Sequence, residues 1–191
     1  MAQRRAFKIG DVLGGKYRIE RIVGEGGMGI VVAAQHIELR QRVAIKLLQG
    51  TALDDAEQVA RFLREARAAV QLRSEHAARV LDVGRTKNRA PFMVMELLEG
   101  QDLGVTLSQG PLPVATAIDY VLQACEAIAE AHALGIVHRD LKPRNLFLTR
   151  RINGEALVKV LDFGLAKQEG DSSTTDKGLT RTTAVMGSPQ Y

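Results

Sequence analysis

The fold is constrained most by an eight-residue stretch, His138-Arg139-Asp140-Leu141-Lys142-Pro143-Arg144-Asn145, and by Asp162-Phe163-Gly164 shortly after it. Apolar runs at 146–148 and 156–161 flank Asn153-Gly154. An Asn-Gly pair between apolar runs is the strongest short signal for a β-hairpin. The predicted hairpin brings Asn145 and Asp162 together, because one precedes its first strand and the other follows its second. There the carboxylates of Asp140 and Asp162 and the amide of Asn145 can hold a divalent metal and a reacting hydroxyl, as phosphoryl transfer requires.

A glycine-rich turn, Gly24-Glu25-Gly26-Gly27-Met28-Gly29, lies between two predicted strands. The strand before it begins at Tyr17, and the β-branched run 30–34 after it also favours a strand. In a dinucleotide-binding fold a helix would follow the glycines instead. Glycines let backbone N–H groups approach phosphates closely. The turn is therefore either a cover for phosphates or an ordinary glycine-rich hairpin, and the motif alone does not decide.

The apolar run around Lys46 predicts a third strand that carries one lysine. This lysine either reaches solvent at the strand edge or points into a cleft beside a counter-ion. Asp54 and Glu57 predict the start of a helix. Glu65 lies beside the apolar stripe of that helix and can face the sheet, or it can pair with Arg61 on the surface. The stripe consists of Val59, Phe62, Leu63, Ala66 and Val70.

The remaining patterns predict two strands, at 79–83 and 92–96, and two helices. A short helix is predicted at 102–108, and a long one begins after Gly110-Pro111-Leu112-Pro113 and ends near Gly135. Residues 1–15 are expected to be a loosely ordered lead-in. The long helix carries the apolar stripe Ile118, Val121, Leu122, Cys125, Ile128 and Ala129, which predicts that Cys125 is a buried structural residue.

Composition narrows the class of protein. The single cysteine cannot form an internal disulfide, which favours a reducing, cytoplasmic setting. The net charge of +4 is mild and no basic run is interleaved with aromatic residues, so no nucleic-acid partner is expected. The chain has neither a signal peptide nor an apolar run long enough to cross a bilayer. A membrane anchor beyond Tyr191 is left open.

Taken together, these motifs resemble those of the serine/threonine protein kinases, and most closely the bacterial branch called eukaryotic-like kinases. The resemblance runs from about Tyr17 to Tyr191 and rests on the order and spacing of four motifs. It implies an α+β, protein-kinase-like fold. Residues 16–97 would form a complete N-terminal lobe with a five-stranded antiparallel sheet and one helix, and residues 98–191 an incomplete helical C-terminal lobe. The motifs are Gly24-x-Gly26-x-x-Gly29-x-Val31, Val43-Ala44-Ile45-Lys46, His138 to Asn145, and Asp162-Phe163-Gly164.

The resemblance implies ATP and Mg²⁺ as cofactors and a protein serine or threonine as the acceptor. Asp140 would orient the acceptor hydroxyl and take its proton, and Lys142 would steady the γ-phosphate. Asn145 and Asp162 would hold Mg²⁺.

The residues implied to bind ATP would cover its phosphates and lie above and below its adenine. Lys46 would contact the α- and β-phosphates and pair with Glu65. Phe147 would lie under the adenine, where the family more often has leucine. Met95 would be the gatekeeper. The full implied set is Gly24, Glu25, Gly26, Gly27, Met28, Gly29, Val31, Ala44, Lys46, Glu65, Met95, Glu96, Leu98 and Phe147.

Regulation is implied by Arg139, which in the family pairs with a phosphothreonine of the activation segment. Thr180, Thr182 and Thr183 are the candidates, and the alternative is that they are ordinary polar loop residues. A dimer that phosphorylates itself in trans is a further partner left open by the resemblance.

One departure from the family concerns the helices that follow Gly-Ser-Pro-Gln-Tyr in a complete C-terminal lobe. Without them we expect a marginally stable fragment, because an apolar helix face stays exposed. Three functions therefore compete. The first is a Ser/Thr kinase catalytic region, and the second an inactive nucleotide-binding or regulatory fragment. The third is a small-molecule phosphotransferase, which would not be expected to carry Leu-Lys-Pro inside the loop.

Overall fold

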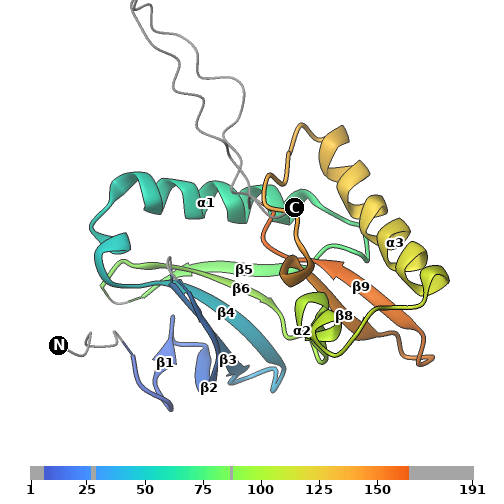
Figure 1. The fold of residues 1–191 in the computed structure, drawn as a ribbon. Coiled ribbons are helices and arrows are strands. Elements are labelled where there is room, and N and C mark those ends of the chain that lie inside the picture. Colours follow the sequence, from blue (N-terminus) through green and yellow to red (C-terminus); the bar gives the residue numbers. More distant parts are fainter. Residues whose placement is uncertain (1–6, 27–28, 87, 164–191) are drawn as a thin grey trace, which may run out of the picture.

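The structure, a computed structural model, describes residues 7–26, 29–86 and 88–163. These residues form a six-stranded sheet with one helix across it, and a smaller three-stranded sheet packed against a long helix (Figure 1). Of the predicted site residues, Gly27, Met28, Thr180, Thr182 and Thr183 lie outside the described residues, as does Gly164 of the Asp162-Phe163-Gly164 motif.

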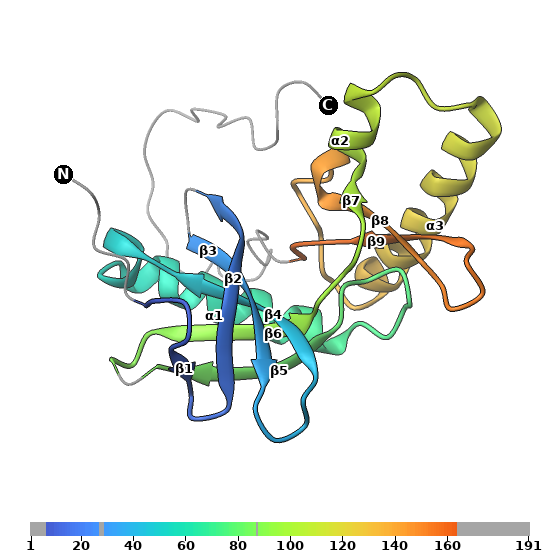
Figure 2. The ribbon, with the colours of Figure 1, turned by 90° about the horizontal axis from the view of Figure 1, so that it is seen from below.

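All neighbouring strands of the larger sheet run antiparallel, in the order β1-β2-β3-β4-β6-β5. Figure 2 shows this sheet from the side opposite to helix α1. The sequence predicted only five of its strands. The strands are β1 (Val12–Leu13), β2 (Tyr17–Gly26), β3 (Gly29–His36), β4 (Arg42–Leu48), β5 (Val80–Arg85) and β6 (Pro91–Glu96).

The additional strand, β1, lies in the segment expected to be a loosely ordered lead-in. That expectation is wrong for residues 7–15. Phe7 and Leu13 are buried in the apolar core formed with Tyr17 and Phe92. Two apolar anchors and the pairing of β1 with β2 therefore hold this segment against the sheet.

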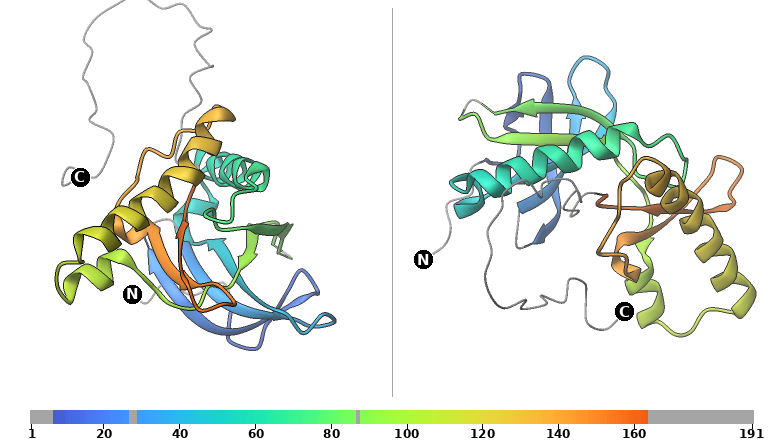
Figure 3. Two further views of the ribbon diagram at one scale, coloured as in Figure 1. Left: turned by 90° about the vertical axis from the view of Figure 1, so that its right-hand side faces the viewer. Right: turned by 90° about the horizontal axis from the view of Figure 1, so that it is seen from above.

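Helix α1 (Ala56–Gln71) follows the short 3₁₀ helix η1 (Gly50–Leu53) and crosses the sheet (Figures 1 and 3). Its N-cap is Asp55 rather than the predicted Asp54. The Asp55 carboxylate accepts hydrogen bonds from the backbone N–H of Glu57, at 2.9 Å, and of Gln58, at 3.2 Å. The predicted stripe is wrong at Val70, which is exposed, because the buried face turns through Phe62, Glu65, Ala66 and Ala69.

The second part contains the predicted hairpin. Its sheet has the order β7-β8-β9, and Gly154 supplies the positive φ of 89° at the hairpin turn. The elements are β7 (Gln101–Asp102), α2 (Leu103–Ser108), α3 (Val114–Ala133), the 3₁₀ helix η2 (Pro143–Asn145), β8 (Leu146–Arg150) and β9 (Ala156–Val160).

Helix α3 packs its alanines inward together with the partly buried Tyr120 and Ile128, and leaves several larger apolar residues exposed. Ala124, Ala127 and Ala131 are buried against the hairpin of β8 and β9 (Figure 3). The prediction that Cys125 is buried is wrong, because it lies on the opposite, exposed face. That face also carries Ile118, Val121 and Leu122, whose residues are 55%, 57% and 60% exposed. Within the described ranges, no helix has both the length and the apolar character needed to cross a membrane.

A loop after α1 joins the two parts. The N–H of Val160 in β9 donates to the carbonyl of His76 at 2.7 Å, and the N–H of Ala78 donates to the carbonyl of Val160 at 3.0 Å. Glu130 of α3 accepts hydrogen bonds from the backbone N–H groups of Arg73 and Ser74, both at 2.8 Å. The β8–β9 hairpin and α3 are therefore both fixed to the loop that follows α1.

Candidate active site

His138 links the eight-residue stretch to the end of the hairpin. Its ring is buried, and its Nε2–H donates to the carbonyl of Leu161 at 2.8 Å. Its Nδ1 accepts from the N–H of Asp140 at 3.3 Å, so both bonds fit the tautomer with the proton on Nε2. The ring also meets Phe163 edge to face, with centroids 5.2 Å apart. His138 therefore fixes where Asp140 and the segment after β9 lie relative to each other.

The Asp140 carboxylate is held by a cation and an amide from its own stretch. Lys142 Nζ donates to Asp140 Oδ2 at 2.7 Å. Asn145 Nδ2 donates to the same oxygen at 3.1 Å and to the Asp140 carbonyl at 2.7 Å. These contacts are local because η2 turns the chain back on itself, starting at Pro143. The preceding Arg139 is half-buried and has a positive φ of 61°.

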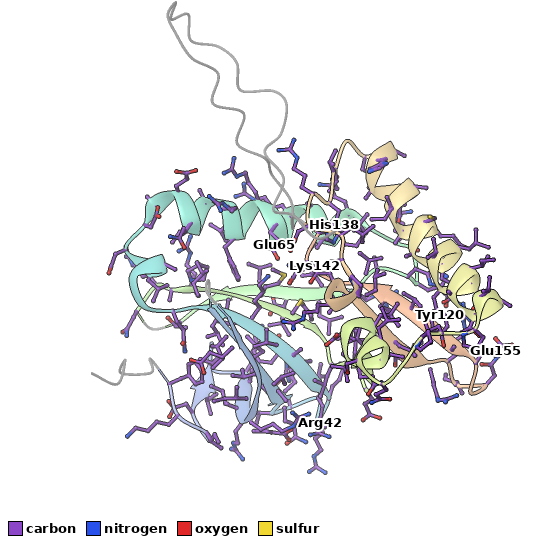
Figure 4. The ribbon with its side chains drawn as sticks, viewed as in Figure 1. Arg42, Glu65, Tyr120, His138, Lys142 and Glu155 are labelled. Atoms are coloured by element: carbon purple, nitrogen blue, oxygen red, sulfur yellow. The ribbon has the colours of Figure 1, made fainter. Side chains whose placement is uncertain are left out.

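Lys46 bridges two carboxylates from distant parts of the chain. Its Nζ lies 2.6 Å from Glu65 Oε1 on α1 and 2.8 Å from Asp162 Oδ1 after β9. The sequence left open whether Glu65 faces the sheet or pairs with Arg61. Glu65 faces the sheet, and Arg61 lies 3.6 Å from Glu57 instead. Figure 4 labels Glu65 on α1 together with His138 and Lys142 of the eight-residue stretch.

The charges of this cluster raise two pKa values. Burial acts to lower the pKa of Lys46, but the carboxylates of Asp162 and Glu65 outweigh it and raise that pKa above its usual value. Burial raises the pKa of Glu65, and the Asp162 carboxylate adds to the effect against the opposing charge of Lys46. The two shifts thus differ in their main cause, since the pKa of Glu65 is raised chiefly by burial and that of Lys46 by the two carboxylates.

Asn145 and Asp162 fit the requirements of a Mg²⁺ site. The carbonyl of Asn145 accepts from the N–H of Leu161 at 2.8 Å, which places Asp162 beside it. Asn145 uses its amide nitrogen toward Asp140, so its amide oxygen is the atom suited to a cation. The described residues contain no group of three or more His, Cys, Asp or Glu that could hold a metal. Mg²⁺ is usually held by one or two carboxylates together with substrate phosphates, and Asp162 offers one such carboxylate.

Strand register brings several of the predicted ATP-binding residues together. Val31 of β3 lies opposite Lys46 of β4, and Ala44 of β4 lies opposite Met95 of β6. Phe147 lies on the neighbouring hairpin, in β8. Two further predicted residues, Glu96 and Leu98, lie where the chain passes from β6 of the larger sheet toward β7 of the smaller one. Both are half-buried.

The glycines of the turn differ in what requires them. A Cβ at Gly29 would clash with the backbone carbonyl of Leu47 on the neighbouring strand, so close pairing of β3 with β4 requires glycine there. A Cβ at Gly24 would meet nothing within 4 Å. Gly24 is therefore free of a packing constraint, unlike Gly29.

One buried ionic contact was not predicted from the sequence. Lys159 of β9 is buried, and its Nζ lies 2.7 Å from Glu96 Oε1. The signal that singled out Lys46, a lysine inside an apolar strand, is also present at 158–160 and could have identified Lys159. A groove of about 800 Å³ lies on this side, lined among others by Glu96, Leu157 and Lys159. Glu96 and Leu98 of the predicted ATP-binding set line this groove, whereas Lys46, Asp140 and Asp162 do not.

Residues 17–191 match the sequence family described as "Protein kinase domain". The chain belongs to the protein kinase family. The serine/threonine-protein kinase pkn3 of Myxococcus xanthus is 43% identical over 184 residues, which cover 96% of this chain and 34% of the relative. The serine/threonine-protein kinase PknA of Mycobacterium tuberculosis is 38% identical over 189 residues, which cover 96% of this chain and 42% of the relative.

The fold is also found among solved kinase domains. The crystal structure of the Mycobacterium tuberculosis PknI kinase domain is similar, with a TM-score of 0.71 and 30% identity over 85% of this chain and 65% of that one. The predicted resemblance to bacterial Ser/Thr kinases and the predicted fold class, with an incomplete C-terminal lobe, are thereby confirmed. The chain spans less than half of the curated relatives named above.

Proposed function

We propose that this chain is the catalytic region of a Ser/Thr protein kinase, which transfers the γ-phosphoryl group of ATP to protein hydroxyls. One observation carries the proposal: the Lys142–Asp140–Asn145 cluster and the Glu65–Lys46–Asp162 cluster are joined through His138 and the backbone of residues 145 and 161. Phosphoryl transfer depends mainly on positioning and on neutralising charge. Both clusters supply positioned charges of the required kinds.

In this proposal Asp140 accepts the proton of the acceptor hydroxyl. Lys142 and Asn145 both contact its Oδ2, and this fixes the plane of the carboxylate before the substrate binds. Lys142 would also steady the γ-phosphate during transfer. The pattern of Lys142 two residues after Asp140 favours serine and threonine acceptors over tyrosine.

Lys46 would neutralise the α- and β-phosphates, with Glu65 holding its ammonium in place. Asn145 and Asp162 would hold Mg²⁺, which would supply charge neutralisation during phosphoryl transfer. The base would lie between Ala44 and Phe147, against the backbone of Glu96 and Leu98. The remaining residues assigned to ATP from the sequence keep their proposed roles.

We place the boundary between the lobes at residues 97 and 98, between the end of β6 and the start of β7. Residues 16–97 form the N-terminal lobe and 98–191 a partial C-terminal lobe. The exposed face of α3 supports this division, because it carries apolar side chains that a complete lobe would cover. We therefore also propose that residues 1–191 alone are less stable than a longer chain.

The location and partners follow from the same reasoning. We propose a cytoplasmic setting, because the single cysteine suits a reducing compartment. Arg139 would bind a phosphorylated Thr180, Thr182 or Thr183, and a second copy of the kinase would be the enzyme that phosphorylates it. Nucleic acid is not a proposed partner.

The alternative function is an inactive nucleotide-binding or regulatory fragment. Transfer of radiolabelled phosphate from ATP to a serine-containing protein distinguishes the two, with Asp140→Asn as the matched control. We expect the wild type to label the acceptor and Asp140→Asn to lose about 10²–10⁴-fold in rate. Equal labelling by both proteins removes Asp140 from the mechanism. Binding of ATP without transfer favours the alternative.

A further inference from the structure

Lys159 places a buried charge in β9, a strand whose packing does not require a charged side chain. The residues on either side, Val158 and Val160, are fully buried, and the Lys159 side chain is only 10% exposed. An ion pair in such a place is weak support for stability, because removing both charges from water costs about as much as their attraction returns. A well-packed apolar side chain would bury the same surface. The charge therefore calls for an explanation other than packing.

The partner of Lys159 is the residue where the sheet of the N-terminal lobe ends. Glu96 Oε1 lies 2.7 Å from Lys159 Nζ, and the same oxygen accepts the backbone N–H of Arg79 at 2.8 Å. The N–H of Glu96 in turn donates to the Arg79 carbonyl at 3.0 Å. Glu96 is thus held by three contacts, two with the backbone of Arg79 just before β5 and one with the hairpin of the other lobe.

The other end of the contact leads to the metal site. Lys159 lies opposite Phe147 in the β8–β9 register, so both side chains leave the same face of the hairpin. Asp162 follows three residues after Lys159. Val160 between them is held at both its N–H and its carbonyl by the loop after α1. Lys159 and Asp162 therefore belong to one short, hydrogen-bonded piece of backbone that keeps their relative positions fixed.

We infer that the Glu96–Lys159 pair is a positioning device that sets the distance between the site for the base and the site for the metal. The inference rests on the proposed function, in which the backbone of Glu96 contacts the adenine and Asp162 holds Mg²⁺. ATP reaches both sites at once, whereas adenosine reaches only the first. Loss of the pair should therefore weaken the binding of MgATP much more than the binding of adenosine.

The test measures binding of MgATP and of adenosine, each by calorimetric titration, to the full-length gene product and to its Lys159→Met variant. We expect the affinity for MgATP to fall about tenfold while the affinity for adenosine changes less than about twofold. Lys159→Arg should restore most of the MgATP affinity, since it keeps the charge. Glu96→Gln should reproduce the loss while keeping an oxygen for the Arg79 N–H, and it serves if Lys159→Met does not fold.

Arg151→Met is the matched control. Arg151 belongs to the same hairpin and also makes a contact between the lobes, with its Nη2 2.7 Å from Glu75 Oε1, but it does not touch Glu96. This variant should bind both ligands as the wild type does. Equal losses for both ligands in Lys159→Met, tighter MgATP binding, or no change each overturn the inference. A wild type that binds neither ligand instead overturns the proposed function.

Discussion

Glu65 should matter far more for nucleotide binding than for stability, and its replacement by glutamine tests this. The side chain of Glu65 is 8% exposed and lies 2.6 Å from Lys46 Nζ. Glutamine has nearly the same shape and keeps an oxygen that can accept a hydrogen bond. The substitution therefore removes the charge and little else.

The effect on stability is small because two contributions oppose each other. Removing one partner of a buried ion pair costs about 3–5 kcal/mol when the other charge is left alone. Lys46 is not left alone, since Asp162 Oδ1 remains 2.8 Å from its Nζ. Burial also raises the pKa of Glu65, which means that its charged form is held at a cost. We therefore expect the free energy of unfolding to change by no more than about 1 kcal/mol.

The effect on MgATP is large because Lys46 then has a single carboxylate left. The ammonium shifts toward Asp162 and competes with Mg²⁺ for it, and it is no longer held where the phosphates would lie. A misplaced charge in a phosphoryl-transfer site costs about 10²-fold in kcat/KM. We expect a loss of that order in the full-length gene product.

The assay combines urea unfolding with steady-state kinetics, and Glu57→Gln is the control on the same helix. Glu57 is 75% exposed and lies 3.6 Å from Arg61, so its loss should change stability by about 0.3–0.5 kcal/mol and leave kinetics unchanged. A loss of several kcal/mol in Glu65→Gln with normal kcat/KM would refute the reasoning. It would show that the Lys46–Glu65 pair holds the fold and does not serve the nucleotide.

The pH dependence gives the same prediction a second readout. A raised pKa means that folded Glu65 binds a proton at a pH where the unfolded chain, with its ordinary value of 4.5, does not. The wild type should therefore gain stability as the pH falls through the raised pKa toward 4.5. Glu65→Gln should lack this gain. Urea midpoints of the two proteins, compared between pH 7 and 4.5, measure the difference.

Two further predictions concern the sheet. Burial, together with a hydrogen bond to Asp82 and its charge, raises the pKa of Tyr17 to about 12. The stabilisation from the neutral phenol should therefore be lost as the pH rises from 10 to about 12, and urea midpoints of Tyr17→Phe should fall less steeply there. Gly29→Ala should lower the melting temperature strongly because its Cβ meets the Leu47 carbonyl, whereas Gly24→Ala should melt as the wild type does. Equal melting temperatures for Gly29→Ala and Gly24→Ala would contradict the clash expected between a Cβ at Gly29 and the Leu47 carbonyl.

The sequence predicts well where a pattern is local. The sequence predicted the hairpin around Asn153-Gly154 and the end of α3 just before Gly135. Turn and cap residues act over only a few positions. The N-cap of α1 was misassigned between the neighbouring acids Asp54 and Asp55. Both fit the pattern, and the structure shows that Asp55, with φ −93° and ψ 104°, is the cap and accepts the hydrogen bonds of Glu57 and Gln58.

The sequence predicts poorly which of two apolar faces is buried. Helix α3 has one face of alanines and one of larger residues, and periodicity favoured the larger, including Cys125. The alanine face packs on the hairpin because small side chains allow the helix and strands to approach closely. Likewise β1 was missed because two residues are too few to show alternation, although Phe7 and Leu13 anchor it.

Lys46 and Lys159 show why local pattern alone cannot identify a site. Each lies in an apolar run, each belongs to a strand, and each pairs with a glutamate from another element. Only the register separates them. Lys46 is flanked by Val31 and Met93 on neighbouring strands and meets Asp162, whereas Lys159 lies opposite Phe147 and meets the end of β6. Register depends on contacts between residues far apart in the sequence. The resemblance to kinases therefore identified Lys46. The contact of Lys159 with Glu96 depends instead on how the two lobes are arranged.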